Sequence, residues 1–208
     1  PDLKCIIVGG EPFSITLVER WANRRYFFNS YGATETSVTV ALAEFKTNSK
    51  QVLIGKPINN TQIYVLDANN KIVPNGVIGE MCVVGASVAA GYWNQQKLTS
   101  EKFMDNPFRF NNKDSIMYKT GDLGRYLPCG NLEFFGRVDR QIKVRGYRID
   151  PAEIEIILNE HPAVNSSMVI LYEKNPNNKL LIAYVLTKMN EIEIVEQLNK
   201  KLKAALPS

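Results

Sequence analysis

The first 40 residues combine short apolar runs with one stretch of helical periodicity. Residues 3–8 form an apolar run that ends at two glycines, residues 9–10, and apolar side chains then recur at near-helical spacing over residues 15–22. A second, aromatic run over residues 26–28 leads into a polar loop at residues 29–36. This order predicts a buried strand, a turn, a helix and a second strand. It is typical of part of an α/β sheet, whose earlier strands we expect to lie upstream of this chain.

From about residue 52 to residue 135 the pattern changes to short strands separated by Asn, Pro and Gly. We expect strands at residues 62–66, 80–84 and 132–135. One helical interruption is predicted near residues 94–104. The region is therefore predicted to be mainly β.

After Asp139, predicted strands at residues 142–144, 164–172 and 180–186 alternate with two helices. This pattern indicates a small α+β unit. The change of pattern predicts a domain boundary near Asp139.

Both helices of this unit have clear sequence signals. Asp150 stands at an N-cap position, Pro151 at the first helical position and Glu153 three residues after the cap, which is a capping-box pattern. The second helix is predicted near residues 191–206. Its predicted buried stripe consists of Ile192, Val195, Leu198, Leu202 and Leu206.

Charge and composition limit the classes of function. The 208 residues include 25 Lys and Arg and 21 Asp and Glu, for a net charge of +4, and these charges are spread along the chain. Such a spread disfavours nucleic-acid binding. No apolar run reaches the roughly 18 to 20 residues that span a bilayer, and the amino terminus lacks a signal-peptide pattern. We therefore predict a cytoplasmic protein without a membrane partner.

Cysteine and histidine are too few and too scattered for several kinds of site. Cys5, Cys82 and Cys129 are far apart and fit neither a disulfide framework nor a metal-binding spacing. With a single histidine, His161, the sequence offers no His-rich metal site, and we expect no Ser-His-Asp triad. We expect the chemistry to depend on carboxylates, cations and backbone groups.

The loop at residues 29–36 holds the ingredients of a nucleotide site. The face of Tyr31 can stack on a purine, Gly32 lets the backbone approach closely, Thr34 can bond a phosphate oxygen and Glu35 can hold Mg²⁺. The alternative interpretation is a polar turn after a strand.

Two later segments are equally ambiguous when taken alone. Residues 118–123 place Asp122 in a predicted tight turn, where a carboxylate can accept both hydroxyls of a ribose, or be an ordinary turn acid. Residues 136–148 carry five cations, including Arg137 and Lys143, which suit phosphate chemistry or line a solvated strand.

Together, these segments resemble successive core motifs of the adenylate-forming superfamily. The three motifs are NSYGATE (29–35), YKTGDL (118–123) and GRVDRQIKVRG (136–146). GEMCVVG (79–85) with AGY (90–92) resembles a further motif between the first two.

Within the superfamily, GRYLP (124–128) and YRIDPAEIE (147–155) resemble the amino-acid adenylation domains of non-ribosomal peptide synthetases. Departures from the family pattern are mild. Ala33 replaces a usual proline, Lys119 a common arginine and Cys129 a usual acid.

The resemblance implies a fold of mixed α/β and α+β class. Residues 1–138 would be the C-terminal part of the large adenylation core subdomain, an α/β sheet edge plus a distorted β-barrel. Residues 139–208 would be the small, mobile α+β C-terminal subdomain, incomplete in this chain. The family's phosphate loop, its substrate-binding aspartate and its catalytic lysine are expected outside these 208 residues, so we expect the chain alone to be inactive.

The implied activity is that of an adenylate-forming ligase. The carboxylate of an acid, expected to be an amino acid, attacks the α-phosphate of ATP and pyrophosphate leaves. The phosphopantetheine thiol of a peptidyl carrier domain then takes the acyl group from the acyl-adenylate. The cofactors implied are ATP and Mg²⁺, with phosphopantetheine on the partner carrier domain.

The resemblance also assigns nucleotide-site residues. Asp122 would bind the ribose hydroxyls with support from Arg137, Thr34 would contact phosphate, and Glu35 would hold Mg²⁺. Thr34, Glu35 and Lys143 are the candidate catalytic residues. The adenine would meet Gly10, Glu11, Pro12 and Tyr31, with Asn29 or Ser30 at its edge.

Further assignments concern the substrate and the second step. Asp139 would be the hinge about which the small subdomain swings, and Gly146 would approach the pantetheine arm. The substrate pocket would include the uncharged residues Ile7, Gly9, Ser30, Val38 and Thr39.

Two alternatives remain open from the sequence. One is a stand-alone relative, either a D-alanine:carrier-protein ligase or an acyl-CoA ligase. The other is a non-catalytic interaction module, suggested by the expected absence of the phosphate loop and the lysine from this chain.

Overall fold

The computed structural model describes residues 2–109, 115–144, 147–175 and 178–206. The chain divides into two compact units, Pro1–Asp139 and Arg140–Ser208, and each is described by itself.

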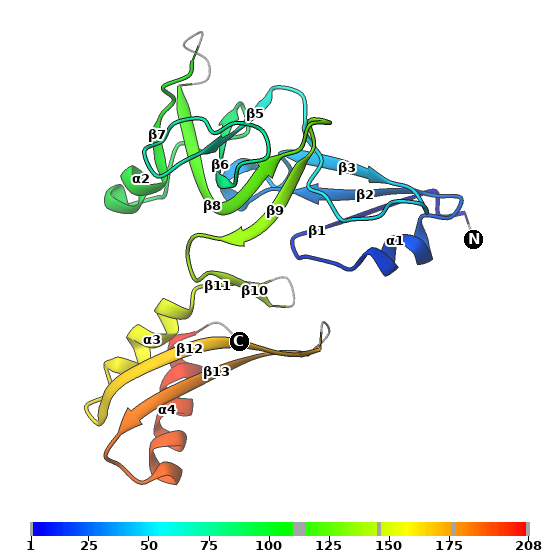
Figure 1. The fold of residues 1–208 in the computed structure, drawn as a ribbon. Coiled ribbons are helices and arrows are strands. Elements are labelled where there is room, and N and C mark those ends of the chain that lie inside the picture. Colours follow the sequence, from blue (N-terminus) through cyan, green and yellow to red (C-terminus); the bar gives the residue numbers. More distant parts are fainter. Residues whose placement is uncertain (1, 110–114, 145–146, 176–177, 207–208) are drawn as a thin grey trace. The chain divides into compact units, whose positions relative to one another are not determined.

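The first unit opens with a four-stranded sheet in the order β1-β2-β3-β4 (Figure 1). β1 runs parallel to β2, and the helix α1 connects them, whereas the other pairs are antiparallel. The strand, helix and strand predicted for the first 31 residues are confirmed. The bounds are β1 (Cys5–Gly9), α1 (Ile15–Trp21), β2 (Tyr26–Tyr31), β3 (Ala41–Phe45) and β4 (Lys56–Pro57).

Helix α1 covers one face of this sheet. Val18 and Ala22 of the helix pack with Phe27, Ala43 and Phe45 in one buried cluster. Because side chains alternate along strands, the neighbouring positions point to the opposite face. That opposite face carries side chains that are at least partly exposed, including Ile7, Ser30 and Leu42.

A second, five-stranded antiparallel sheet completes the first unit. Its path is β5-β6-β8-β7, and β9 also pairs with β8. The mixed α/β class is confirmed, although among the described residues the sheet stays open and forms no closed barrel. The bounds are β5 (Thr61–Leu66), β6 (Gly79–Gly85), α2 (Gln96–Lys102), β7 (Phe103–Asp105), β8 (Ile116–Tyr126) and β9 (Leu132–Arg137).

The two sheets share one hydrophobic core. One buried cluster contains Val40, which precedes β3, and Ile54, which precedes β4. It also contains Val65, Met81 and Leu132 of the second sheet. Backbone hydrogen bonds reinforce the join, since the Ile54 amide donates to the Leu132 carbonyl over 2.9 Å. The ends of β2 and β8 are thereby fixed within one unit.

The prediction of a tight turn at Asp122 is wrong, because this residue lies inside strand β8. Glu80 pairs with Leu123 and Cys82 with Lys119, so residues 120–122 lie opposite a single residue of β6. Such a bulge bends a strand without reversing it.

The second unit contains a short hairpin, a long hairpin and two helices (Figure 1). Helix α3 begins as predicted, since the Asp150 carboxylate accepts the Ala152 amide over 3.0 Å. The bounds are β10 (Ile142–Val144), β11 (Tyr147–Ile149), α3 (Pro151–Asn159), β12 (Val164–Asn175), β13 (Asn178–Thr187) and α4 (Glu191–Ala205).

The predicted stripe of α4 is partly wrong. Ile192 and Val195 are 73% and 50% exposed, whereas Ile194 and Leu198 are buried. Residues four apart stack along one side of a helix, so Ile194, Leu198 and the partly buried Leu202 face the core together.

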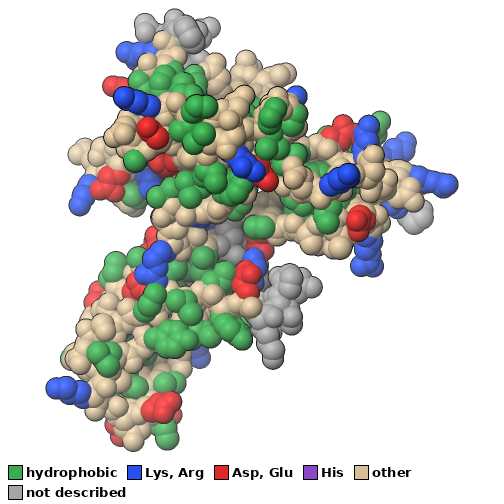
Figure 2. Space-filling view, viewed as in Figure 1, with side chains coloured by type: hydrophobic (Ala, Val, Ile, Leu, Met, Phe, Trp, Pro, Cys, Tyr) green, Lys and Arg blue, Asp and Glu red, His purple; other side chains and the backbone are tan. Residues whose placement is uncertain are grey.

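The long hairpin has an exposed apolar face. Met168 pairs with Tyr184, and Tyr172 with Leu180, and all four are 46% to 59% exposed. Figure 2 shows hydrophobic side chains on the surface where Figure 1 draws β12 and β13. Within the described part of the chain, no helix has the length and apolar character needed to cross a membrane.

Candidate active site

Tyr31, Asp122 and Arg137 meet in the first unit. Tyr31 is the last residue of β2, and its hydroxyl donates a hydrogen bond of 2.5 Å to Oδ2 of Asp122, 91 residues away. Arg137 pairs with Asp122 across β8 and β9, and its Nη1 donates to Oδ1 of the same carboxylate. The structure therefore brings together three residues that the sequence assigned to one nucleotide site.

The bulge in β8 holds Asp122 in this position. The Thr120 hydroxyl donates to the Met81 carbonyl over 2.7 Å and accepts the Asp122 amide over 2.9 Å. The Gly121 amide donates to Glu80 over 3.0 Å. Backbone and side-chain bonds on both sides of the bulge thus fix its shape.

Two features favour glycine at position 121. Its φ is +74°, a conformation that side chains rarely adopt. A Cβ at this position would lie 2.7 Å from Nη2 of Arg137 and 2.8 Å from Oδ2 of Asp139. A larger residue would require these two side chains to shift.

Arg137 bonds to a second carboxylate, that of Asp139. Its Nε donates to Oδ1 over 2.6 Å and its Nη2 to Oδ2 over 2.8 Å. Nη2 also donates to the Thr120 carbonyl over 3.0 Å. One guanidinium therefore joins the predicted ribose-binding acid to the predicted hinge.

The Tyr31 phenol and the Arg137 guanidinium both keep the protons that they donate in these hydrogen bonds. Burial and the nearby Asp122 carboxylate raise the pKa of Tyr31 well above its usual value, so the phenol stays a donor. Burial acts to lower the pKa of Arg137, but the carboxylates of Asp139 and Asp122 outweigh it and raise that pKa. The guanidinium stays charged.

Glu35 lies in a 3₁₀ turn (Thr34–Thr36) shortly after Tyr31. Its side chain is 8% exposed, and Oε1 accepts a hydrogen bond of 2.6 Å from the Tyr92 hydroxyl. Tyr92 packs edge-on against Phe103, which fixes its ring. Thr34 is exposed at the start of the turn.

Glu35 can offer a carboxylate oxygen to a magnesium ion. Mg²⁺ usually takes one or two carboxylates and completes its shell with waters and phosphate oxygens. The described residues contain no cluster of three or more His, Cys, Asp or Glu side chains that could hold a metal by itself. A site built on Glu35 would take its other ligands from waters and phosphate oxygens.

Sequence reasoning missed the role of Tyr92. Its segment, AGY, was matched to a family motif without any assigned contact. The residue lies 57 positions after Glu35, so no local pattern indicates the hydrogen bond.

The residues predicted around adenine lie at the carboxyl ends of two parallel strands. Gly9 of β1 pairs with Ser30 of β2, which places the following segment, Gly10, Glu11 and Pro12, next to the end of β2. Ligands of open α/β sheets commonly bind at such strand ends.

Asn29 and Ser30 point to opposite faces. The Asn29 amide donates to the Leu53 carbonyl over 2.8 Å, whereas the Ser30 hydroxyl lies 2.7 Å from the hydroxyl of Thr39. Ser30 shares its face with Ile7 and Gly9 because neighbouring strand residues alternate. This arrangement favours Ser30 over Asn29 for contacts with a ligand on that face.

Four of the five predicted pocket residues thus lie together on one face of the first sheet. The fifth, Val38, has an unusual backbone conformation. Val38 is 74% exposed and has φ of +74°, directly after Ser37 at +55°. A β-branched residue rarely adopts this conformation, and such strain is concentrated at functional sites.

Two predicted residues belong to the second unit. Lys143 lies in β10, but its side chain is outside the described residues, as is all of Gly146.

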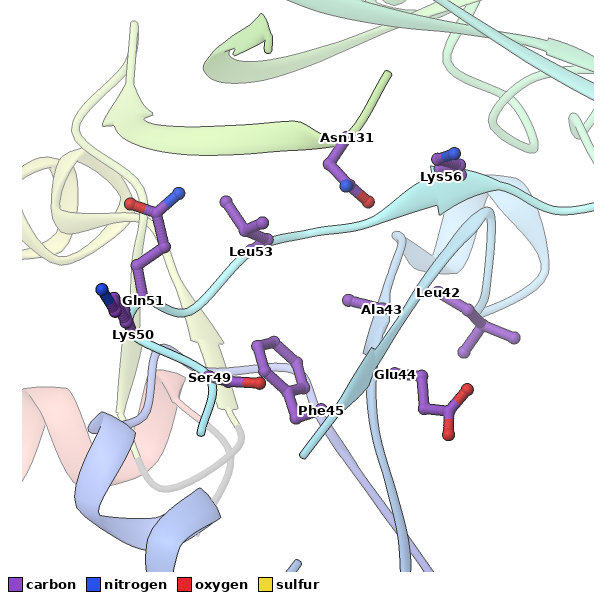
Figure 3. A pocket seen from close by; sticks show the side chains of 10 residues that line it. All are labelled: Leu42, Ala43, Glu44, Phe45, Ser49, Lys50, Gln51, Leu53, Lys56 and Asn131. Atoms are coloured by element: carbon purple, nitrogen blue, oxygen red, sulfur yellow. The ribbon is translucent and has the colours of Figure 1, made fainter. Parts of the chain in front are cut away.

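A pocket of about 390 Å³ lies elsewhere in the first unit, between β3, residues 49–56 and Asn131 (Figure 3). Lys50, Lys56 and Glu44 are among its lining residues, and none of the predicted site residues lines it. The chemistry of the Asp122 cluster therefore identifies the candidate site better than cavity size does.

Known proteins match this chain over its whole length. The family model for AMP-binding enzymes matches residues 1–93. A linear gramicidin synthase of Brevibacillus parabrevis is 47% identical over 207 residues, which is 100% of this chain and 3% of that protein. Bacitracin synthase 3 of Bacillus licheniformis is 45% identical over 203 residues, 97% of this chain and 3% of that protein.

A solved structure agrees with these sequence matches. NpsA-ThdA, an artificially fused adenylation-PCP di-domain NRPS from Klebsiella oxytoca, superposes with a TM-score of 0.80 at 28% identity. The match covers 98% of this chain and 38% of that one.

The predicted resemblance to the adenylate-forming, AMP-binding superfamily is confirmed by the family model over residues 1–93 and by these relatives. Within that superfamily the chain is similar to the amino-acid adenylation domains of non-ribosomal peptide synthetases, and it spans only a small part of the synthetases it matches.

Proposed function

We propose that the protein containing this chain activates an amino acid as aminoacyl-AMP and passes it to the phosphopantetheine thiol of a peptidyl carrier domain. The observation that carries this proposal is the Tyr31, Asp122 and Arg137 cluster in a chain of the AMP-binding family. Its chemistry matches what a ribose and an adenine require.

Asp122 is the proposed ribose ligand. A carboxylate offers about four lone-pair sites, so each oxygen can accept a ribose hydroxyl while it keeps its bond to Tyr31 or Arg137. The two protein donors hold the carboxylate before ATP arrives, which lowers the ordering cost of binding.

Thr34 and Glu35 are proposed to act at the phosphates. The exposed Thr34 hydroxyl would donate to a phosphate oxygen, and Tyr92 would orient the Glu35 carboxylate that holds Mg²⁺. A bound Mg²⁺ stabilises negative charge on the phosphates. Lys143 stays a candidate for the same charge stabilisation.

The second half-reaction is assigned to the remaining residues. Residues 1–138 and 139–208 would be the core and mobile subdomains, Asp139 the hinge between them, and Gly146 the contact for the pantetheine arm. The natural partner is proposed to be a peptidyl carrier domain, supported by the adenylation-PCP fusion in NpsA-ThdA.

The pocket residues suggest what part of the substrate this chain contacts. Ile7, Gly9, Ser30, Val38 and Thr39 carry no charge, so they favour contact with an uncharged part of the acid. Because the reaction consumes ATP, a cytoplasmic location belongs to the same proposal.

Carrier loading by the full-length protein tests this function. The protein would be incubated with ATP, Mg²⁺ and each of a panel of amino acids, D-alanine and fatty acids, and its carrier domain analysed by mass spectrometry. We expect the mass of one aminoacyl thioester.

Other outcomes distinguish the alternatives. Loading of a separate carrier protein with D-alanine, or transfer to coenzyme A, would identify a stand-alone ligase. Absence of any adenylate or thioester with the whole panel would contradict the proposal and favour the interaction module.

A further inference from the structure

The motif at residues 79–85 contains an acid without an assigned role, Glu80 of strand β6. Its Oε1 accepts the Gly121 amide over 3.0 Å, and its Oε2 lies 3.2 Å from Nζ of Lys119. The Glu80 side chain is only 19% exposed. One carboxylate of β6 therefore contacts two residues of β8 at the bulge.

The bulge in β8 creates the need for a side-chain acceptor. Residues 120–122 lie opposite Met81 alone, so they cannot all pair with backbone groups of β6. A partly buried amide that lacks an acceptor is costly. The Glu80 carboxylate supplies that acceptor for Gly121, the middle residue of the bulge.

Gly121 is connected on both sides to residues of the candidate site. Asp122 follows it directly, and the Asp122 amide donates to the Thr120 hydroxyl over 2.9 Å. The Gly121 carbonyl accepts the Val138 amide over 2.8 Å, one residue after Arg137. A shift of the Gly121 peptide would therefore move Asp122 relative to Arg137.

We propose that Glu80 is a positioning residue for the ribose-binding acid, and that it acts through its hydrogen bond to Gly121 rather than through its ion pair with Lys119. The Lys119 side chain is 30% exposed, and ion pairs open to solvent contribute little. A bond from an amide to a carboxylate is charge-assisted and stronger than a neutral one. This inference rests on the proposed function, in which Asp122 binds the ribose.

Two substitutions of Glu80 separate the hydrogen bond from the charge. Glu80→Gln keeps an acceptor oxygen at the end of a side chain of the same length but removes the charge. Glu80→Asp keeps the charge, but its side chain is one methylene shorter and would not reach the Gly121 amide.

The first measurement is ATP–pyrophosphate exchange by the full-length protein. We expect Glu80→Asp to raise the KM for ATP by at least about fivefold and Glu80→Gln to stay within about twofold of wild type. The KM for the activated acid should be unchanged in both variants, because the proposed pocket residues belong to β1, β2 and the segment between β2 and β3.

The second measurement is amide hydrogen exchange in the full-length protein, which needs no catalysis. Glu80→Asp should speed exchange of the Asp122 and Val138 amides by about three- to tenfold, because the bulge loses one of its hydrogen bonds. Glu80→Gln should leave both rates close to wild type.

Glu133→Asp is the matched control. Glu133 is also a partly buried acid of this sheet, with a side chain 22% exposed, and it pairs with Arg125 over 2.8 Å, outside the bulge. Shortening it should change neither the KM for ATP nor the exchange of the Asp122 and Val138 amides.

Two kinetic results would overturn the proposed role of Glu80. One is a wild-type KM for ATP in Glu80→Asp, even if amide exchange is faster, since Glu80 would then stabilise the bulge without positioning Asp122. The other is an equal rise of this KM in Glu80→Gln and Glu80→Asp, since the ion pair would then be responsible.

If the wild-type protein activates no acid at all, the proposed function fails. Amide exchange alone then decides whether Glu80 holds the bulge, and equal rates in wild type and Glu80→Asp would show that it does not.

Discussion

At Asp122, hydrogen-bond donors from two other strands of the first unit already occupy the carboxylate. Tyr31 reaches it from β2 and Arg137 from β9. The position of this acid therefore depends on bonds that can be removed one at a time.

Tyr31→Phe removes the hydroxyl donor and keeps the ring. The partly buried Asp122 carboxylate would lose one charge-assisted hydrogen bond, and the free energy of unfolding should fall by about 2 kcal/mol. Urea unfolding of the first unit measures this loss.

Tyr26→Phe is the matched control for that measurement, because Tyr26 lies on the same strand and is 63% exposed. It should change stability by less than about 0.5 kcal/mol. Equal effects of the two substitutions would show that the Tyr31 hydroxyl bond does not stabilise the fold.

The cysteines differ in reactivity. Burial, with the nearby Glu80 carboxylate, raises the pKa of Cys82 to about 12, and its side chain is fully buried. Cys5 and Cys129 are exposed, and hydrogen bonds from Asn131 lower the pKa of Cys129. Iodoacetamide at about pH 8, near the usual thiol pKa, should modify Cys129 and Cys5 but leave Cys82 intact until urea unfolds the chain. Modification of Cys82 in the folded protein, detected by peptide mass spectrometry, would contradict this burial.

At the residue scale, the sequence predicted which residues lie together better than it predicted their individual hydrogen bonds. Residue types and family motifs were sufficient to group Tyr31, Asp122 and Arg137. The Tyr92–Glu35 bond was not predictable, because it depends on how a loop between β6 and α2 packs against a turn 57 residues earlier. Asn29 was assigned to the ligand edge as an alternative to Ser30, but its amide bonds to Leu53.

At the scale of elements, the bulge in β8 determines where the site lies. It aligns Asp122 with Arg137 on β9 and leaves room for the Arg137 side chain beside Gly121. Strand β8 therefore positions side chains of the candidate site in addition to pairing within the sheet.

Gly121→Ala should destabilise the first unit by about 2 kcal/mol, partly from the positive φ and partly from contact with Arg137 and Asp139. Denaturant unfolding measures the change.

Gly76→Ala provides the control, because Gly76 also has positive φ, +88°, but a Cβ there meets nothing within 4 Å. Its cost should be about 1 kcal/mol, from the backbone conformation alone. A Gly121→Ala cost no larger than that of Gly76→Ala would mean that the Arg137 side chain adapts freely.

Strand pairing and core packing explain which elements were not predicted correctly from the sequence. Strand β8 contains Gly121 and Gly124, which normally indicate turns, and its pairing with β6 and β9 overrides that signal. Helix α4 was predicted correctly, but its apolar residues allow two neighbouring stripes. Packing within the second unit's core selects the one that contains Ile194 and Leu198.

At the scale of the whole molecule, the two units differ in how much of the proposed function they carry. All the described contacts among Tyr31, Asp122 and Arg137 lie within Pro1–Asp139. Mixed α/β composition and a change of pattern near Asp139 were visible in the sequence. The sequence did not show that the second sheet stays open among the described residues, because closure of a sheet depends on strands far apart in the chain.

The 208-residue chain by itself should show no amino-acid-dependent ATP–pyrophosphate exchange. It corresponds to 38% of the NpsA-ThdA chain, and the family's phosphate loop and catalytic lysine are not among its motifs. Exchange by this chain above a no-enzyme control would refute the expectation.

The most direct test of the central claim is amino-acid-dependent ATP–pyrophosphate exchange by the full-length protein, compared between wild type, Asp122→Ala and Asp105→Ala. Asp105 is an exposed acid at the end of β7 and serves as the control. We predict exchange with one or a few amino acids, and a loss of about 100-fold in kcat/KM for ATP in Asp122→Ala alone, because hydrogen bonds from the ribose to a charged group are lost. Equal kcat/KM for ATP in wild type and Asp122→Ala would contradict the account.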